Sequence, residues 1–155
     1  MKVEYVEPFV DAASDVLHQI LGCNPTKGAP GLTGAIFPTA CINIAARVDG
    51  SLQGNVVCSM STKTACKLTE SILGVQAHVF GRQMGSALVK LGNDLIEYSS
   101  RLLAERGLDC RVSSPTVFQG MNVEFSSLTP ALVVPIDTNV GRVEISVAVD
   151  DDQQS

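Results

Sequence analysis

The sequence predicts an α+β fold with a mostly antiparallel sheet and helices packed on one face of that sheet. Three segments carry apolar residues at the three- and four-residue spacing of amphipathic helices. Two pairs of segments alternate apolar and polar residues as strands do, and each pair is joined by a short turn sequence. Strands joined by short turns run antiparallel, so the helices are expected to lie together as a layer on the sheet.

Length and composition predict a single domain over residues 1–150, followed by an acidic, solvated tail at 151–155. The chain has 155 residues, of which 45% are hydrophobic and 17% are charged, and this is enough for one proper core. Its formal net charge is -5, and no cluster of lysine or arginine is present. A nucleic-acid partner is therefore not expected, because binding to phosphates needs a basic surface.

The N-terminal sequence and the cysteines predict a soluble, cytoplasmic protein with no membrane partner. Acidic residues stand where a signal peptide would have basic and apolar regions, and no apolar run approaches the length of about 18 residues that spans a bilayer. The five cysteines are odd in number and lack a C-x-x-C spacing, so they are predicted to be buried thiols. His18 and His78 have no companion at metal-ligand spacing, so no metal of the protein's own is expected.

The first two segments are predicted to be a helix and a connector. Residues 8–21 place apolar side chains along one face, with Pro8 in the first turn, where helices accept proline. Residues 22–34 are rich in glycine and proline, which interrupts both the helix and the strand period. In a phosphate-binding loop a lysine follows the last glycine, whereas here Lys27 precedes Gly28 and a strand-like run follows, so a plain connector is preferred.

A hairpin and a second helix are predicted next. In residues 35–60 the apolar period changes to two, and turn residues divide the segment into two strands. Ser61 or Thr62 can cap a helix over residues 63–73, and Gly74 stands where a helix of this kind ends.

The longest helical pattern covers residues 81–107 and carries an ordered polar stripe. Apolar residues recur on one face at spacings of three and four, as in a helix that lies on a core. The opposite face carries four polar residues at spacings of four, three and four: Ser86, Lys90, Asn93 and Glu97. They are predicted to point outward side by side. Such a stripe is also typical of any solvated helix, so the pattern alone assigns no function.

The C-terminal part is predicted to be mainly strand. Residues 109–119 are rich in β-formers and are interrupted at Pro115, which suits an edge, a bend or the start of a strand. Residues 131–136 and 142–149 are predicted to form a second hairpin, with alternate apolar residues of its last strand pointing inward. The outward polar residues of this last strand favour an edge position, which would allow a homodimer through that edge: Arg142, Glu144 and Ser146.

Six parts of the sequence together resemble a known family. They are PFVDAASDVL, GLTGAI, SLQGNVVCSMS followed by LTESILG, the long helix, and SSPTVFQG. The family is the CheC/CheX/FliY phosphatases of bacterial chemotaxis, with the CheX group nearest. The resemblance implies the CheC-like fold and hydrolysis of the aspartyl phosphate of a CheY-type response regulator. In the family motif D/S-x-x-x-E-x-x-N, the Asn aligns the attacking water and the Glu pairs with a lysine of the regulator. Ser86 matches the first motif position and Asn93 matches the last.

The motif departs from the family pattern at Lys90, which stands where the family has Glu. Asn93 keeps the ability of a neutral carboxamide to position a water for in-line attack. A lysine that faces the regulator's lysine is repulsive, so docking in the family's usual register is expected to weaken. Lys90 could instead face the phosphoryl oxygens or pair with Asp94 four residues later. Glu97 is a further candidate for contact with a cation of the partner.

Three functional hypotheses follow from these observations. The first is a CheX-like phosphatase in which Asn93 positions the water, while Ser86, Lys90 and Glu97 contact the regulator. The regulator would supply Mg²⁺, and the chain would contribute no cofactor of its own. The second is a non-catalytic binding or scaffold domain of a two-component pathway, whose chemistry has been lost through Lys90. The third is a structural module that dimerises through its edge strand.

Overall fold

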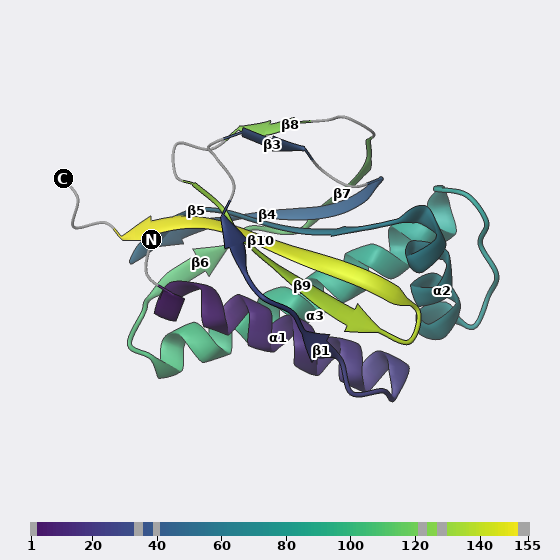
Figure 1. The fold of residues 1–155 in the computed structure, drawn as a ribbon, viewed down its shortest axis with the longest axis horizontal. Coiled ribbons are helices and arrows are strands. Elements are labelled where there is room, and N and C mark those ends of the chain that lie inside the picture. The colour runs from purple at the N-terminus through teal and green to yellow at the C-terminus, as the bar shows by residue number, and fades with distance from the viewer. Residues whose placement is uncertain (1–2, 33–35, 39–40, 121–123, 127–129, 152–155) are drawn as a thin grey trace.

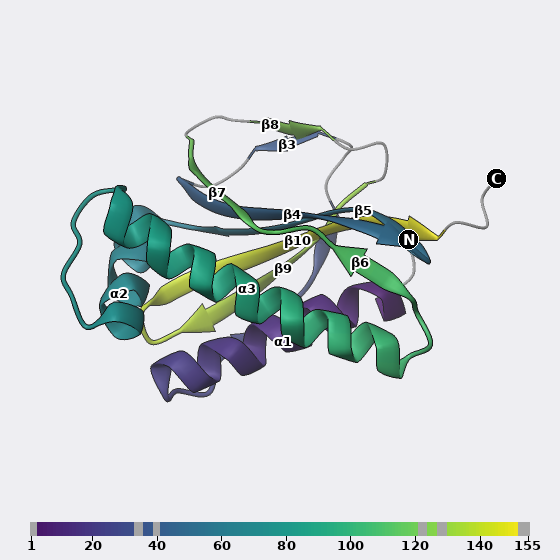
Figure 2. The same cartoon turned by 180° about the vertical axis from the view of Figure 1, so that it is seen from behind.

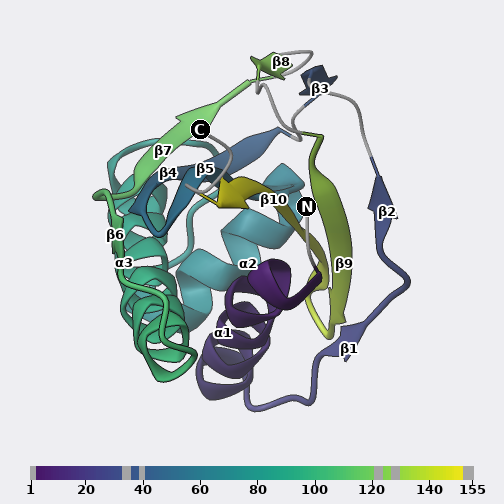
Figure 3. The same cartoon turned by 90° about the vertical axis from the view of Figure 1, so that its left-hand side faces the viewer.

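Three helices and a large sheet account for most of the computed structural model, which describes residues 3–32, 36–38, 41–120, 124–126 and 130–151. The helices are α1 (Val3–Leu21), α2 (Thr62–Leu73) and α3 (Arg82–Glu105). They lie on one face of the sheet, as Figures 1 and 2 show from opposite sides. A short ribbon of β3 (Ile36–Pro38) and β8 (Glu124–Ser126) lies on the other face (Figure 3). The predicted α+β fold is therefore confirmed.

The main sheet contains eight strands among the described residues, and all of their pairings are antiparallel. The strand order is β1-β9-β10-β5-β4-β6, while β2 also pairs with β9 and β7 also pairs with β4. These strands are β1 (Thr26–Lys27), β2 (Gly31–Leu32), β4 (Ile42–Gly50), β5 (Leu52–Met60), β6 (Cys110–Val112), β7 (Thr116–Gln119), β9 (Leu132–Thr138) and β10 (Gly141–Asp151). The two predicted hairpins, β4–β5 and β9–β10, form the centre of the sheet.

The last strand, β10, lies inside the sheet, so its predicted edge position was wrong. It pairs with β5 on one side and with β9 on the other over most of its length. Glu144, which suggested an edge, lies on the face of the sheet opposite the helices. Its polarity is therefore explained by the face on which it lies and does not indicate an edge strand. Residues 143–147 of β10 are paired on both sides, so this part of the strand offers no open edge to a second copy. β10 also includes Asp151, the first residue of the predicted tail, and 152–155 lie outside the described residues.

The glycine- and proline-rich segment, predicted to be a plain connector, runs along the outer side of β9. Its residues form β1 and β2, and both pair with β9. Lys27 Nζ lies 2.7 Å from Asp11 Oδ1, which ties the segment to α1. Strands of two residues are too short to show a period of two, which is why the sequence pattern did not reveal them. The last residues of the segment, 33–34, lie outside the described part of the chain.

Helix α1 begins at Val3, so Pro8 lies inside the helix and not in its first turn as predicted. Proline has no N–H to donate to the carbonyl four residues earlier, which here belongs to Glu4. Arg106, at the end of α3, supplies a donor in its place. Its Nη1 donates to the Glu4 carbonyl at 3.0 Å and to Glu7 Oε2 at 3.2 Å. The start of α1 and the end of α3 are thereby joined.

The other two helices begin and end close to the predicted residues. Ser61 caps α2, because its Oγ accepts a hydrogen bond from the Thr64 backbone N–H at 3.1 Å. Gly74 ends α2 with a left-handed φ of 70°, which glycine adopts without strain. None of the helices that the structure describes is long and apolar enough to cross a membrane.

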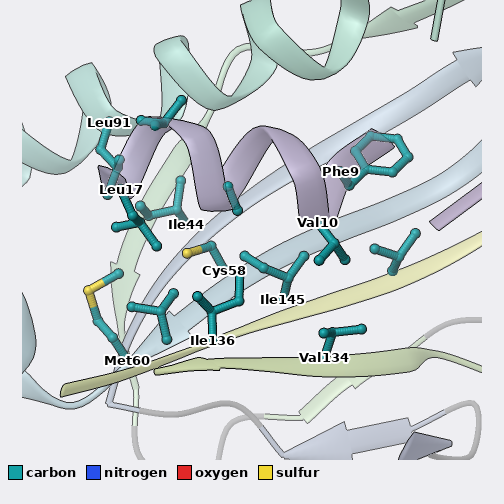
Figure 4. Packing of buried hydrophobic residues seen from close by; sticks show 14 of the residues in the cluster. Phe9, Val10, Leu17, Ile44, Cys58, Met60, Leu91, Val134, Ile136 and Ile145 are labelled. Carbon is teal, nitrogen blue, oxygen red and sulfur yellow. The ribbon is translucent and has the colours of Figure 1, made fainter. Parts of the chain in front are cut away.

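The main core lies between the helices and the sheet, and Figure 4 shows part of it. Phe9, Val10 and Leu17 of α1 contribute to it from the helical side. The predicted inward residues of β10 are all buried in it: Val143, Ile145, Val147 and Val149. Cys58 of β5 lies in the same core, and burial raises the pKa of its thiol to about 12 because the thiolate would lose its hydration.

Candidate functional site

The predicted polar stripe on α3 is exposed along its whole length. Its four residues all face solvent: Ser86, Lys90, Asn93 and Glu97. The opposite face of the helix is buried, with Met84, Leu88 and Leu91 in the core. In Figure 2, α3 lies on the outside of the helical layer. The stripe is therefore open to a partner protein.

The backbone of α3 next to Asn93 packs directly against the edge of the sheet. Gly92 is buried, and a Cβ at this position would lie 2.7 Å from Pro115 Cβ and 3.0 Å from Ile44 Cγ2. Pro115 stands between β6 and β7, which both pair with β4. Because only glycine fits this gap without a shift of its neighbours, the distance between α3 and the sheet is set at the residue before Asn93.

The Asn93 side chain makes no hydrogen bond within the described part of the chain, and the same holds for Ser86. A carboxamide accepts hydrogen bonds through Oδ1 and donates them through Nδ2 while it stays neutral. Asn93 therefore combines a free polar group with a firmly held backbone. Such a group can orient a water molecule or a polar atom of a partner.

Glu97, the last residue of the stripe, is already paired on its own helix. Arg101 Nη2 lies 3.4 Å from Glu97 Oε1, and the Arg101 guanidinium lies 5.4 Å from the centre of the Tyr98 ring. Exposed pairs of this kind are worth less than about 1 kcal/mol, so a partner cation could still compete for Glu97. The contact with Arg101 therefore weakens the case for Glu97 as a partner contact.

Lys90 lies at the rim of a recess that no other stripe residue lines. The recess has a volume of about 240 Å³ and lies between the ends of α1 and α2 and the middle of α3. Its lining residues are Gln19, Ile20, Ser71, Ile72, Lys90, Leu91 and Asp94. Although Lys90 and Asp94 both line it, no ion pair joins them in the structure as described, so the suggested pairing within the helix is not formed. The charge of Lys90 is thus not neutralised by a direct contact.

The reactive side chains elsewhere in the described chain do not gather into a second site. The raised pKa of the Cys58 thiol suppresses the thiolate, which is the reactive form. His18 Nδ1 lies 2.6 Å from the Cys23 carbonyl oxygen, in a contact just beyond α1. Among the described residues, no group of three or more His, Cys, Asp or Glu side chains is placed to hold a metal ion.

Comparison with known proteins finds similarity to chemotaxis proteins of the CheX and CheC-like groups. The chain is 23% identical over 138 residues to the CheY-P phosphatase CheX of Thermotoga maritima, which is 88% of each chain. Its structure matches a CheC-like superfamily protein from a Shewanella species with a TM-score of 0.85, 18% identity, and coverage of 97% of this chain and 99% of that one. It also matches the CheX–CheY–BeF3–Mg²⁺ complex from Borrelia burgdorferi with a TM-score of 0.80, 23% identity, and coverage of 97% and 100%. No protein-family model matches the chain.

These similarities confirm the resemblance that the sequence motifs indicated, and the fold is CheC-like. The roles of Ser86, Lys90, Asn93 and Glu97 stay predictions. The sequence did not reveal the contact of Gly92 with Pro115, although a glycine in the middle of a strong helical pattern was an available signal. Nor did it reveal the recess, because its residues come from three helices that are far apart in the sequence.

Proposed function

We propose that this chain is a CheX-like protein that hydrolyses the aspartyl phosphate of a CheY-type response regulator in the cytoplasm. The observation that carries the proposal is Asn93, a free and exposed carboxamide on a firmly held helix. It stands at the Asn position of the motif, in a chain similar to the CheY-P phosphatase CheX of Thermotoga maritima. The regulator docks on the exposed face of α3.

The proposed reaction requires that a water molecule be positioned, and it does not require a reactive side chain in this protein. Water must attack the phosphorus in line with the bond to the regulator's Asp carboxylate, which then leaves. Asn93 Oδ1 accepts a hydrogen bond from this water and holds it in the direction of attack. The entropic cost of orienting the water is thereby met before the reaction, which lowers the activation free energy. The regulator contributes the phosphoryl group and the Mg²⁺ that neutralises its oxygens, so the chain needs no cofactor of its own.

The remaining stripe residues meet the surface of the regulator around the phosphoryl group. Ser86 lies two turns before Asn93 on the same face and offers a hydroxyl. Lys90 places a positive charge where a carboxylate would attract a lysine of the regulator, so docking is weaker and turnover slower than with Glu. Glu97 offers a carboxylate beyond Asn93, in competition with Arg101.

The alternative function is non-catalytic binding, and Lys90 is the observation that favours it. A domain that repels the regulator's lysine can still bind other parts of the regulator, or another protein of the pathway, without placing Asn93 on the water. The two functions differ in turnover. A catalyst releases more phosphate than its own molar amount, whereas a binding domain does not.

The experiment is phosphate release from a phosphorylated CheY-type regulator with the protein present in substoichiometric amount. We expect wild type to accelerate release and Lys90→Glu to accelerate it further by about tenfold, because one repulsive charge pair becomes attractive. Lys63→Glu is the control, since it makes the same charge change at an exposed residue of α2. If wild type and Lys90→Glu both bind the regulator but neither accelerates phosphate release, the binding function is established instead.

A further inference from the structure

The recess between the three helices is electronegative apart from Lys90. The last carbonyl groups of a helix have no partner within the helix, and together they act as about half a negative charge. Gln19 lies in the last turn of α1 and Ser71 in the last turn of α2, so two such ends border the recess. Asp94 adds a carboxylate that has no hydrogen-bond or ion-pair partner within the described residues. The two helix ends and the Asp94 carboxylate together carry about two units of negative charge. This exceeds the positive charge of Lys90 by about one unit.

The recess offers both hydrogen-bond acceptors and apolar surface. Gln19 Nε2 donates to Tyr98 Oη at 3.2 Å, which leaves Gln19 Oε1 able to accept. The apolar part of the lining comes from one residue on each helix: Ile20, Ile72 and Leu91. The volume of about 240 Å³ is below the range of about 300–1,000 Å³ that pockets for drug-sized ligands occupy. This space suits a single long side chain better than a cofactor.

We propose that the recess binds a primary ammonium group, and that this group is the lysine side chain of a protein docked on the exposed face of α3. The three N–H donors of the ammonium match the Asp94 carboxylate, Gln19 Oε1 and the carbonyls at the helix ends. The methylene groups of the lysine pack against the apolar part of the lining. A metal cation would use the oxygens but would leave that apolar surface uncovered.

Lys90 is a competitor at the rim of this site. In the free protein its ammonium offsets part of the negative charge without pairing with an acceptor among the described residues, so an incoming lysine has to overcome its repulsion. Asp94 directly follows Asn93, so a lysine held at Asp94 brings its own protein against Asn93. The identity of the docking protein as a response regulator rests on the proposed function, whereas the ammonium site does not.

A titration with Nα-acetyl-lysine N-methylamide tests the site without a regulator. Amide NMR signals of Gln19, Ser71 and Ile72 in isotope-labelled protein should shift in a saturable way. Asp94→Asn should weaken this binding about tenfold, because a charge-assisted hydrogen bond is lost. Lys90→Ala should strengthen it about two- to fivefold, because an exposed competing cation is removed.

The control variant is Glu105→Gln, which removes an exposed carboxylate at the far end of the same helix and should leave the affinity unchanged. The norleucine analogue tests the apolar lining alone, and potassium ions test the hydrogen-bond acceptors alone. Neither should saturate the site at the concentrations at which the lysine compound saturates it. Absence of saturable shifts, or tighter binding of Nα-acetyl-glutamate N-methylamide, would overturn the ammonium site. Tighter binding of spermidine would overturn the assignment to a docking protein.

Binding of a phosphorylated regulator to the same variants separates this inference from the proposed function. Asp94→Asn should weaken the complex and Lys90→Ala should strengthen it, in parallel with the lysine compound. If the lysine compound binds but no regulator does, the proposed function is wrong and the ammonium site stands. If the regulator binds Asp94→Asn as tightly as wild type, the docking role of the recess is wrong and the proposed function stands.

Discussion

Asn93 and its neighbours contribute different properties to the candidate site. Asn93 provides a free polar group, while Gly92 before it provides the close contact with Pro115 that holds the helix in place. Positioning catalysis needs both, because a misplacement of about 1 Å is enough to lose most of its benefit. Lys90 and Asp94 add opposite charges on the side of the recess, so the electrostatic character of this face is mixed.

Gly92→Ala should lower the free energy of unfolding by about 1–2 kcal/mol. The new methyl group would meet Pro115 Cβ at 2.7 Å and Ile44 Cγ2 at 3.0 Å, and such overpacking costs more than the roughly 1 kcal/mol that alanine gains over glycine in a helix. Urea unfolding followed by circular dichroism measures the change.

Gly85→Ala on the same helix is the matched control for this prediction. A Cβ at Gly85 would have no neighbour within 4 Å, so only the gain in helix propensity remains, and the variant should be about 0.5–1 kcal/mol more stable than wild type. Equal stability of the two alanine variants would show that the contact between Gly92 and Pro115 does not hold α3.

At the scale of elements, α3 is tied to α1 near both ends of their contact. Arg106, just beyond α3, donates to the Glu4 carbonyl near the start of α1. Gln19, near the end of α1, donates to the Tyr98 hydroxyl of α3 at 3.2 Å. These bonds complement the apolar packing of the two helices, and they keep the helix that carries Asn93 in one orientation on the sheet.

The contact between Arg106 and Glu4 should be coupled to Pro8. Arg106→Ala should destabilise wild type by about 0.5–1.5 kcal/mol, because it removes the hydrogen bond to the Glu4 carbonyl together with an exposed pair with Glu7 that adds little. In a Pro8→Ala background alanine 8 supplies the missing N–H to the Glu4 carbonyl, so the same Arg106→Ala change should cost less. A double-mutant cycle from urea unfolding should give a coupling energy of about 0.5 kcal/mol or more.

Arg101→Ala serves as the control in this cycle. The partners of Arg101, Glu97 and Tyr98, lie on its own helix, so its cost should be the same with or without Pro8. If Arg106→Ala costs equally much in both backgrounds, the guanidinium does not replace the helical donor that proline lacks.

At the scale of the whole molecule, the sequence predicted the parts of the fold that local pattern determines. The period of two identified β4–β5 and β9–β10, and the caps at Ser61 and Gly74 placed the ends of α2. The order of strands depends on contacts between distant segments, and no local pattern reports those contacts. The polar alternation of β10 was therefore mistaken for an edge, and the short pairings of β1 and β2 with β9 were missed.

The same distinction applies to the site. The exposed stripe follows from helix geometry alone, and the structure confirms that Ser86, Lys90, Asn93 and Glu97 share the solvent side of α3. The recess required the tertiary arrangement, because Gln19 and the end of α2 approach Asp94 only in the folded chain. The pairing of Lys90 with Asp94 was geometrically allowed on the helix, but the structure does not form it.

The most direct test of the account is the rate of phosphate release from a phosphorylated CheY-type regulator under multiple turnover, compared between wild type and Asn93→Ala. Asn93 is exposed and free of protein partners among the described residues, so its replacement should leave the fold and the free energy of unfolding nearly unchanged. We predict that wild type accelerates release above the regulator's own rate, and that Asn93→Ala loses about a hundredfold of that acceleration. Equal release with wild type and Asn93→Ala would contradict the account.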